Sequence, residues 1–306
     1  MASAALRDTR RRIRSVEAIK KITRAMELIA ASRIPKAVAR VNASKPYTAK
    51  LIEVIETVGG ASSADATHML LEQRPVNTVG VVVVAADRGL AGAYSSNIIR
   101  MAEQAIIEQR QAGRDIVLYT VGKTAQSYFR YRNYRIERAW LGVTDTPGYG
   151  DARSIARTIM EAYASEEIDE VQAFYTQFRS AITQVPTQFR LLPIVPPEAT
   201  GERPVVNYEY EPSPAEILDR LLPRYVEATV FNMLLEASAS EHSARRRAMK
   251  AATDNAEELV KTLTRRGAHP PPDGPGQPGP SGGDHHRHHR DRGWSRGFGR
   301  IRFLRR

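Results

Sequence analysis

Cysteine is absent from the 306-residue sequence, and this absence removes several classes of function at once. Disulfide bonds, thiol catalysis and cysteine-ligated zinc are all excluded. No run of apolar residues approaches the roughly 18 that a membrane-spanning helix requires. No apolar block follows the basic residues of the N-terminus, as a signal peptide would require. Together these absences predict a cytosolic or peripheral protein.

Acidic residues are too few to balance the basic ones, and the formal net charge is +11. The imbalance is concentrated in residues 266–306, where nine Arg and three Asp occur without Lys or Glu, a net charge of +6. The preceding 265 residues therefore carry only +5, which a surface of mixed charges produces. The hydrophobic content of the chain, 42%, is sufficient for a packed core.

Residues 1–60 read as one very long helix, from Leu6 to about Val58. We expect kinks near Pro35 and Pro46, because proline removes a backbone donor. A narrow apolar stripe on an otherwise charged helix is typical of a coiled-coil seam. About 50 residues at about 1.5 Å each span on the order of 75 Å, longer than a compact domain is wide. The stripe consists of Ile13, Val16, Ile19, Ile22, Met26 and Ile29.

Residues 61–212 show the alternating pattern of an open, Rossmann-like α/β domain. The run Val79–Ala85 is continuously apolar, as expected of a parallel strand covered on both faces. A turn at Arg88–Gly92 leads into a helix, whereas Trp140–Asp151 is left unassigned, an ordinary loop being one interpretation of it. The further expected strands are Asp115–Val121, Tyr134–Leu141, Glu170–Phe178 and Thr187–Pro193, and the expected helices are Ile98–Gln111, Thr124–Arg132 and Asp151–Ser165.

Helical periodicity returns at Ser213, a predicted N-cap, and holds to Arg265. A stripe of large apolar residues gives way along this helix to smaller ones, which allow another helix to approach closely. The long helices of residues 1–60 and 213–265 can bury their stripes only against each other, so we predict an antiparallel two-helix coiled coil. The stripe comprises Leu218, Leu222, Tyr225, Val226, Val230, Met233 and Leu234, then Ala244, Ala248, Met249, Ala252, Ala256, Leu259 and Leu263.

Residues 266–306 differ in kind from the helix before them. Between 266 and 300 there is no Val, Ile, Leu or Met, while proline and glycine are frequent. Such a segment cannot bury enough apolar surface to offset a chain entropy of about 1–2 kcal/mol per residue. We therefore predict a disordered tail, with the helix ending at or before His269 because Pro270 follows it.

Three motifs make the sequence resemble the gamma subunit of the bacterial rotary (F-type) ATP synthase, along nearly its whole length to Arg265. They are RRIRSVEAIKKITRAMELIAASR near the N-terminus, AADRGLAGAYSSN in the middle, and YEYEPSPAEILDRLLPRYVEATVFNMLLEASASEHSARRRAMKAATDNAEEL. The resemblance implies a non-catalytic central-stalk rotor. Its coiled coil would be the shaft inside a hexamer of alternating alpha and beta subunits, coupling proton flow to ATP synthesis or hydrolysis.

The same resemblance implies partners and contact residues. The α/β domain would lie at the foot of the shaft, against the epsilon subunit and the membrane ring (the c-ring), with the complex peripheral to the plasma membrane on its cytoplasmic side. No cofactor, metal or small-molecule substrate is implied. The resemblance assigns Lys21, Arg24, Met26, Arg245 and Met249 to the surface that faces the stator, and Tyr210, Glu211 and Pro212 to the foot interface.

The tail is where the sequence departs from the family, whose last helix continues with a pattern such as N-x-A-R-Q-A-x-I-T. Read one nucleotide later, the codons for Gln277–Ser295 admit N-R-A-R-Q-A-x-I-T-T-D-I-T-E-I-V-G-G-A, which matches the family's ending. We infer a frameshift upstream of Gln277, either genuine or introduced by sequencing. On this interpretation the histidine-rich tract at residues 285–289 is read from shifted codons and is not a selected metal site.

Two binding alternatives remain beside the rotor. The loop DRGLAGAYSSN follows a strand and precedes a helix, where phosphates bind, but it lacks both the GxGxxG and the GxxxxGK[ST] pattern. A tight turn explains its glycines, with Ser95 or Ser96 capping the helix. The basic clusters Arg10–Arg14 and Arg245–Arg247 could contact nucleic-acid phosphates, although no aromatic side chains for stacking lie nearby.

An enzyme is the third class, and the sequence gives it little support. Before the tail the only histidines are His68 and His242, and no Ser/His/Asp arrangement can be assembled around them. The acidic residues near Glu166 are explained by a solvated helix end.

Overall fold

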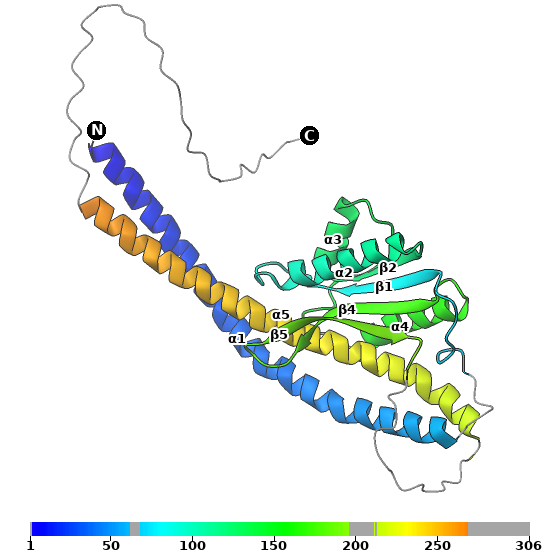
Figure 1. Ribbon diagram of the computed structural model, residues 1–306. Coiled ribbons are helices and arrows are strands. Elements are labelled where there is room, and N and C mark those ends of the chain that lie inside the picture. Colours follow the sequence, from blue (N-terminus) through cyan, green and yellow to red (C-terminus); the bar gives the residue numbers. More distant parts are fainter. Residues whose placement is uncertain (1, 62–67, 196–210, 212, 269–306) are drawn as a thin grey trace, which may run out of the picture.

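The computed structural model describes residues 2–61, 68–195, 211 and 213–268. Two long helices form a rod, and a domain built on one β-sheet lies beside one half of it (Figure 1). Helix α1 spans Ala2–Ala61 and helix α5 spans Pro214–Ala268. They run antiparallel, so the predicted pair of helices is confirmed. The predicted disordered tail, apart from the last turn of α5, lies outside the described residues, as does the segment behind the frameshift hypothesis.

The seam between the helices includes only part of the predicted stripe of α1: Ile13, Val16 and Met26 are half-buried, whereas the other three members are exposed. Ile19 and Ile22, two members of the predicted stripe, are 50% and 60% exposed. The buried positions here are Thr23 and Ala30, and the hydroxyl of Thr23 lies 2.8 Å from that of Thr253 on α5. Because α5 presents small side chains along this stretch, the helices approach closely and small or polar residues of α1 fit the seam better than isoleucine.

The rod becomes apolar where the domain also packs on it. Val41 of α1 is buried against Leu235 and Ala239 of α5. Further along, Ile55 and Val58 of α1 join the large core cluster that α5 shares with the sheet. Helix α5 therefore lies between α1 and the sheet domain over this half of the rod.

A five-stranded sheet in the order β3-β2-β1-β4-β5 forms the centre of the domain. All neighbouring strands are parallel except β4 and β5, which are antiparallel. The predicted open α/β sheet is confirmed, and β2 and β4 have the predicted bounds. The strands are β1 (Thr78–Val84), β2 (Asp115–Val121), β3 (Ile136–Trp140), β4 (Glu170–Phe178) and β5 (Gln184–Leu192).

Both faces of the sheet are covered, which explains the unbroken apolar run in β1. Val82 and Val84 point into the cluster formed with α4 and α5, whereas Val81 and Val83 point into the cluster formed with α2. The side chains of one strand alternate between two buried faces, so every position is apolar. The helices are α2 (Tyr94–Gln111), α3 (Lys123–Tyr131) and α4 (Tyr149–Ala164).

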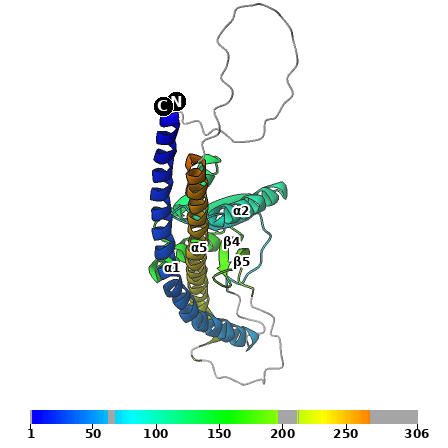
Figure 2. The ribbon, with the colours of Figure 1, turned by 90° about the vertical axis from the view of Figure 1, so that its left-hand side faces the viewer.

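Helix α1 is continuous but not straight. Its N-terminal half, dark blue in Figure 2, runs beside α5, and its lighter C-terminal half turns away from that line. Pro35 and Pro46 lie inside the helix. A proline removes one backbone hydrogen bond and crowds the preceding turn, which bends a helix without ending it when tertiary packing holds both sides.

Candidate functional site: the rod surface and its junction with the sheet domain

The half of α1 that precedes Pro35 carries basic and apolar side chains on different sides, and near its lower end Met26 and Ile29 line a cavity with Arg88, Gly89 and Leu90 of the sheet domain. Lys21 and Arg24 are exposed and Met26 is half-buried. Arg24 pairs with Glu27 on the next turn at 3.0 Å. On another side of the helix lie three large apolar side chains that the isolated chain leaves in solvent, and we call these the exposed apolar face. It consists of Ile19, Ile22 and Ile29. Leu28, which is also exposed, lies on the side of Lys21 and Arg24.

Arg245 and Met249, which the sequence assigned to the same surface, are buried in this chain. The guanidinium of Arg245 donates to the carboxylate of Glu241 at 2.6 Å and to the carbonyl oxygens of Arg88 at 3.1 Å and Gly89 at 3.3 Å. It therefore fastens α5 to the loop that follows β1. Its role at an intersubunit surface stays a prediction. Of the residues expected at the foot, Glu211 is exposed, while Tyr210 and Pro212 lie outside the described residues.

The loop between β1 and α2 corrects one detail of the sequence analysis. Helix α2 begins at Tyr94 with Ala93 as its N-cap, and no side chain caps it. The hydroxyl of Ser95 instead accepts the N–H of Ala86 at 3.3 Å, and that of Ser96 donates to the carbonyl of Ala93 at 3.1 Å. The two serines stabilise the loop locally and leave the first turn of α2 without a side-chain partner, so the predicted serine cap is wrong.

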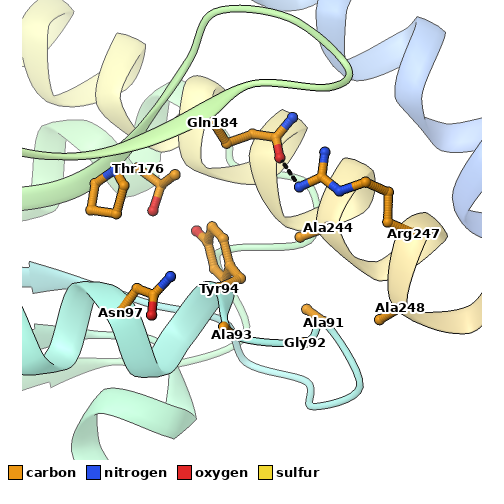
Figure 3. A pocket seen from close by; sticks show the side chains of 11 residues that line it. Ala91, Gly92, Ala93, Tyr94, Asn97, Thr176, Gln184, Ala244, Arg247 and Ala248 are labelled. Atoms are coloured by element: carbon orange, nitrogen blue, oxygen red, sulfur yellow. Dashed lines mark hydrogen bonds between the residues drawn. The ribbon is translucent and has the colours of Figure 1, made fainter. Parts of the chain in front are cut away.

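A cavity of about 340 Å³ lies where this loop meets β4, β5 and α5 (Figure 3). Open α/β sheets bind ligands at the carboxyl ends of their strands, where the strand order changes direction, and this is that place. Here α5 crosses the crevice and closes most of it with Ala244 and Ala248. Arg247 donates to the carbonyl oxygens of Ala181 at 2.9 Å and Ile182 at 2.8 Å. The main occupant of the crevice is thus helix α5 of the rod, which packs against it.

The segment that the sequence left unassigned contains the feature that sequence reasoning missed. Residues 141–148, between β3 and α4, are held to the end of β1 by the carboxylate of Asp87. That carboxylate accepts the backbone N–H groups of Gly142 at 2.9 Å and Thr144 at 3.0 Å and the hydroxyl of Thr144 at 3.1 Å. Gly142 adopts a φ of +75°, which favours glycine. The one sequence signal was the density of turn-forming residues in LGVTDTPG.

The same loop contacts both helices of the rod through Asp145. The guanidinium of Arg33 on α1 donates to both carboxylate oxygens of Asp145. On α5, the hydroxyl of Ser238 donates to the carbonyl of Asp145 at 3.1 Å, and Nε2 of His242 lies 3.3 Å from that oxygen. Burial, the largest single influence, favours the neutral acid. The hydrogen bond and charge of Arg33, with His242 and Arg88, outweigh it and lower the pKa of Asp145.

Burial lowers the pKa of His242, the one histidine in the junction, so the ring is neutral near pH 7. Its Nδ1 has no hydrogen-bond partner among the described residues. The other described histidine, His68, pairs with Asp219 at 3.3 Å in a different part of the fold. Across residues 2–61, 68–195 and 213–268 there is no group of three side chains suited to hold a metal ion. The same residues contain no helix with the length and apolar character of a membrane span.

Comparisons with known proteins agree on one group. The profile of the family described as ATP synthase matches residues 5–267. The ATP synthase gamma chain of Acidothermus cellulolyticus is 47% identical over 270 residues, covering 86% of this chain and 89% of that one. The gamma chain of Mycolicibacterium smegmatis is 43% identical over 280 residues, covering 86% and 90%.

Solved structures of similar shape show the fold. One is the central stalk and c-ring structure of Tetrahymena thermophila mitochondrial ATP synthase, with a TM-score of 0.57 at 21% identity, covering 76% of this chain and 99% of that one. Another is the rotor of Euglena gracilis mitochondrial ATP synthase, with a TM-score of 0.61 at 15% identity, covering 87% and 97%.

Proposed function

The chain belongs to the ATP synthase gamma chain family, and from this premise we propose that it turns as the central-stalk rotor of a proton-translocating synthase. It couples ion flow through the membrane ring to ATP synthesis or hydrolysis at the alpha/beta hexamer. The gamma chain itself is a non-catalytic stalk subunit, and its complex is associated with the membrane. We assign the chain to the cytoplasmic side of the plasma membrane.

The observation that carries this proposal is the rod half that extends beyond the sheet domain. Among the described residues, the two helices pair there with no other element around most of their length, and the exposed apolar face lies on a different side of α1 from Lys21 and Arg24. Large apolar side chains left in solvent over about three turns of a helix indicate a surface that a partner covers. A rod whose end is enclosed by a ring of subunits fits both features.

Upper and lower parts of the molecule are assigned to different partners. The alpha and beta subunits surround the rod half that carries Lys21, Arg24 and Met26. The sheet domain and the turn at Tyr210 and Glu211 face the epsilon subunit and the c-ring. Arg245 supports the same stator-facing stretch from inside the junction, because its side chain orders the loop after β1, and Met249 is buried one turn further along α5.

The nucleic-acid alternative finds no support in these residues. Of the cluster Arg245–Arg247, the first guanidinium is buried and the third is bound to carbonyl oxygens, so the cluster is not an open basic patch. The exposed side chains beside the other basic residues are aliphatic, whereas single-strand binding uses aromatic platforms.

Replacement of Ile22 by aspartate tests the rotor assignment. In the proposed complex it buries a charge against the hexamer, so membrane-bound ATPase activity and ATP-driven proton pumping should fall together. The matched control is Ile107→Asp, which changes a partly exposed isoleucine on α2 of the sheet domain. Full pumping in vesicles that contain the Ile22→Asp chain would exclude a covered rod surface at this position.

A crosslinker tests the orientation. Introduced at Tyr210, a photoreactive side chain should capture the epsilon subunit or a ring subunit. Capture of the beta subunit instead would reverse the assignment of the foot.

A further inference from the structure

We infer that Asp145 is a positioning residue that fixes the sheet domain to α1, so that α1 and the domain turn as one body. Helix α5 lies between them over half of the rod, and α1 could therefore rotate around α5 while the domain stayed behind. A contact that spans from α1 directly to the domain prevents this. The structure has such a contact at the loop of residues 141–148.

One short segment of this loop is bound from two sides. The carboxylate of Asp145 receives the guanidinium of Arg33, and two residues later the carbonyl of Pro147 receives that of Arg40; both arginines are on α1. From α5, Ser238 donates to the backbone carbonyl of Asp145 at 3.1 Å. The segment thus holds both helices of the rod at one level.

The loop can transmit force only if it is itself fixed to the sheet. Asp87, directly after β1, accepts three hydrogen bonds from the loop, and its own N–H donates to the hydroxyl of Thr144 at 3.0 Å. The same carboxylate accepts the N–H of Lys123 at the start of α3, at 3.0 Å. Thr144 is buried. Loop, β1 and α3 therefore form one rigid unit.

Directional contacts are needed because the apolar contacts of α1 do not fix its rotation around α5 relative to the sheet domain. The hydrophobic effect scales with buried area and has no preferred direction, so the burial of side chains such as Val41 directs no bond at a particular partner. A charge-assisted hydrogen bond, in contrast, is directional, and Nη1 of Arg33 donates to both oxygens of Asp145. The ion pair of Lys20 and Glu257 at 3.1 Å joins α1 only to α5, whereas Arg33 joins α1 to the domain.

That Asp145 transmits torque rests on the proposed function, whereas the contact between α1 and the sheet domain does not. If torque enters at the foot, α1 receives part of it through Asp145. Loss of this contact should let the upper rod lag behind the domain. Hydrolysis at the hexamer would then continue while fewer protons are pumped for each ATP consumed.

Distances between spin labels test the contact directly. The chain has no cysteine, so Ala39→Cys on α1 and Arg157→Cys on α4, both exposed, can be labelled in the full-length chain assembled with its hexamer. Double electron–electron resonance should give a narrow distribution for the parent. In Asp145→Asn the detached population should rise about five-fold, the factor that corresponds to about 1 kcal/mol for a partly exposed ion pair.

Matched variants separate this contact from general damage. Arg33→Lys keeps the charge but carries it on a flexible chain in place of the planar guanidinium, and should give an intermediate distribution even if Asp145→Asn fails to assemble. The double variant Arg33→Gln/Asp145→Asn should be no broader than either single variant, because both break one contact. Arg132→Gln, which removes an ion pair with Glu103 inside the domain, should leave the distribution unchanged.

Two outcomes overturn the inference, and neither depends on the rotor assignment. An unchanged distance distribution in Asp145→Asn and Arg33→Lys would show that α1 is held by other contacts. A distribution that broadens equally in Arg132→Gln would show that any lost ion pair loosens the fold. If the distribution broadens as expected while pumping per ATP stays at the parent level, the contact positions α1 without carrying torque, and the functional half of the inference fails alone.

Discussion

Replacing Arg245 with methionine should destabilise the folded chain more than any other single change on the surface of α5. Its guanidinium is 8% exposed and has three acceptors, one of which is the carboxylate of Glu241, itself 1% exposed. Methionine fills similar volume but donates nothing. The carboxylate would then stay buried without its cation, and the carbonyl oxygens of Arg88 and Gly89 would lose their donor.

The magnitude follows from the loss of one partner of a buried pair. Removing one member costs about 3–5 kcal/mol, because the other charge is left uncompensated. The carboxylate can limit this cost by taking up a proton. Burial already raises the pKa of Glu241, and Arg245 opposes that rise. Without Arg245 the pKa rises further, so the destabilisation should shrink as the pH is lowered, by up to about 1.4 kcal/mol for each pH unit.

Urea unfolding of the full-length chain, followed by circular dichroism at several pH values, measures both effects. The double variant Arg245→Met/Glu241→Leu should recover most of the loss, since a buried pair replaced by apolar residues is often neutral. Arg247→Met serves as the control, because this more exposed guanidinium has no carboxylate partner among the described residues, and it should cost less than about 1.5 kcal/mol. A double variant as unstable as Arg245→Met would refute the role of the buried carboxylate.

Three further changes test the junction. Gly122 has a φ of +95°, and a Cβ there would lie 2.1 Å from a backbone oxygen. Gly122→Ala should therefore leave little soluble protein. Gly150 has open space around it, so Gly150→Ala should be expressed at the level of the parent. Burial lowers the pKa of His242, so the unfolded chain binds a proton at this histidine at a higher pH than the folded chain does. The contribution of His242 to stability should be full above about pH 6.5 and be lost as the pH falls through the lowered pKa. Urea titrations of His242→Gln should show a weaker dependence of stability on pH over this range. Asp87→Asn should weaken the bonds to the loop by about 1–3 kcal/mol, measured as faster amide exchange at Thr144.

The elements of this fold could be predicted because each has a local pattern. The valine run of β1 requires burial on both faces, and the long helices carry an apolar period that no other structure satisfies. The face that α1 turns to α5 could not be read in this way. Ile19 and Ile22 mark one helical stripe and Thr23 a neighbouring one, and a period does not reveal which stripe meets a partner within the chain and which meets a partner outside it.

The junction was missed for a related reason. Asp145 and Arg33 are 112 positions apart, and neither residue type identifies the other in a chain with 45 basic and 34 acidic side chains. Arg245 has the same ambiguity, because a helical arginine is usually solvated. Glu241, four residues earlier, is an acceptor that the spacing allows, but only tertiary structure shows that the others are backbone carbonyl oxygens of the loop after β1, which have no sequence signature.

The bend in α1 gives the rod an uneven elasticity. Pro35 and Pro46 provide no N–H, so the carbonyl oxygens of Ala31 and Asn42 lose their usual donors within the helix. A helix resists bending because backbone hydrogen bonds join each turn to the next, and here two of these hydrogen bonds are missing within a few turns. Helix α1 should therefore bend most easily between Pro35 and Pro46, beside the sheet domain, and less easily in the half that precedes Pro35. The weakest stretch of α1 is thus the one where Arg33 and Arg40 bind the sheet domain, so the domain supports the helix where its own hydrogen bonds are fewest.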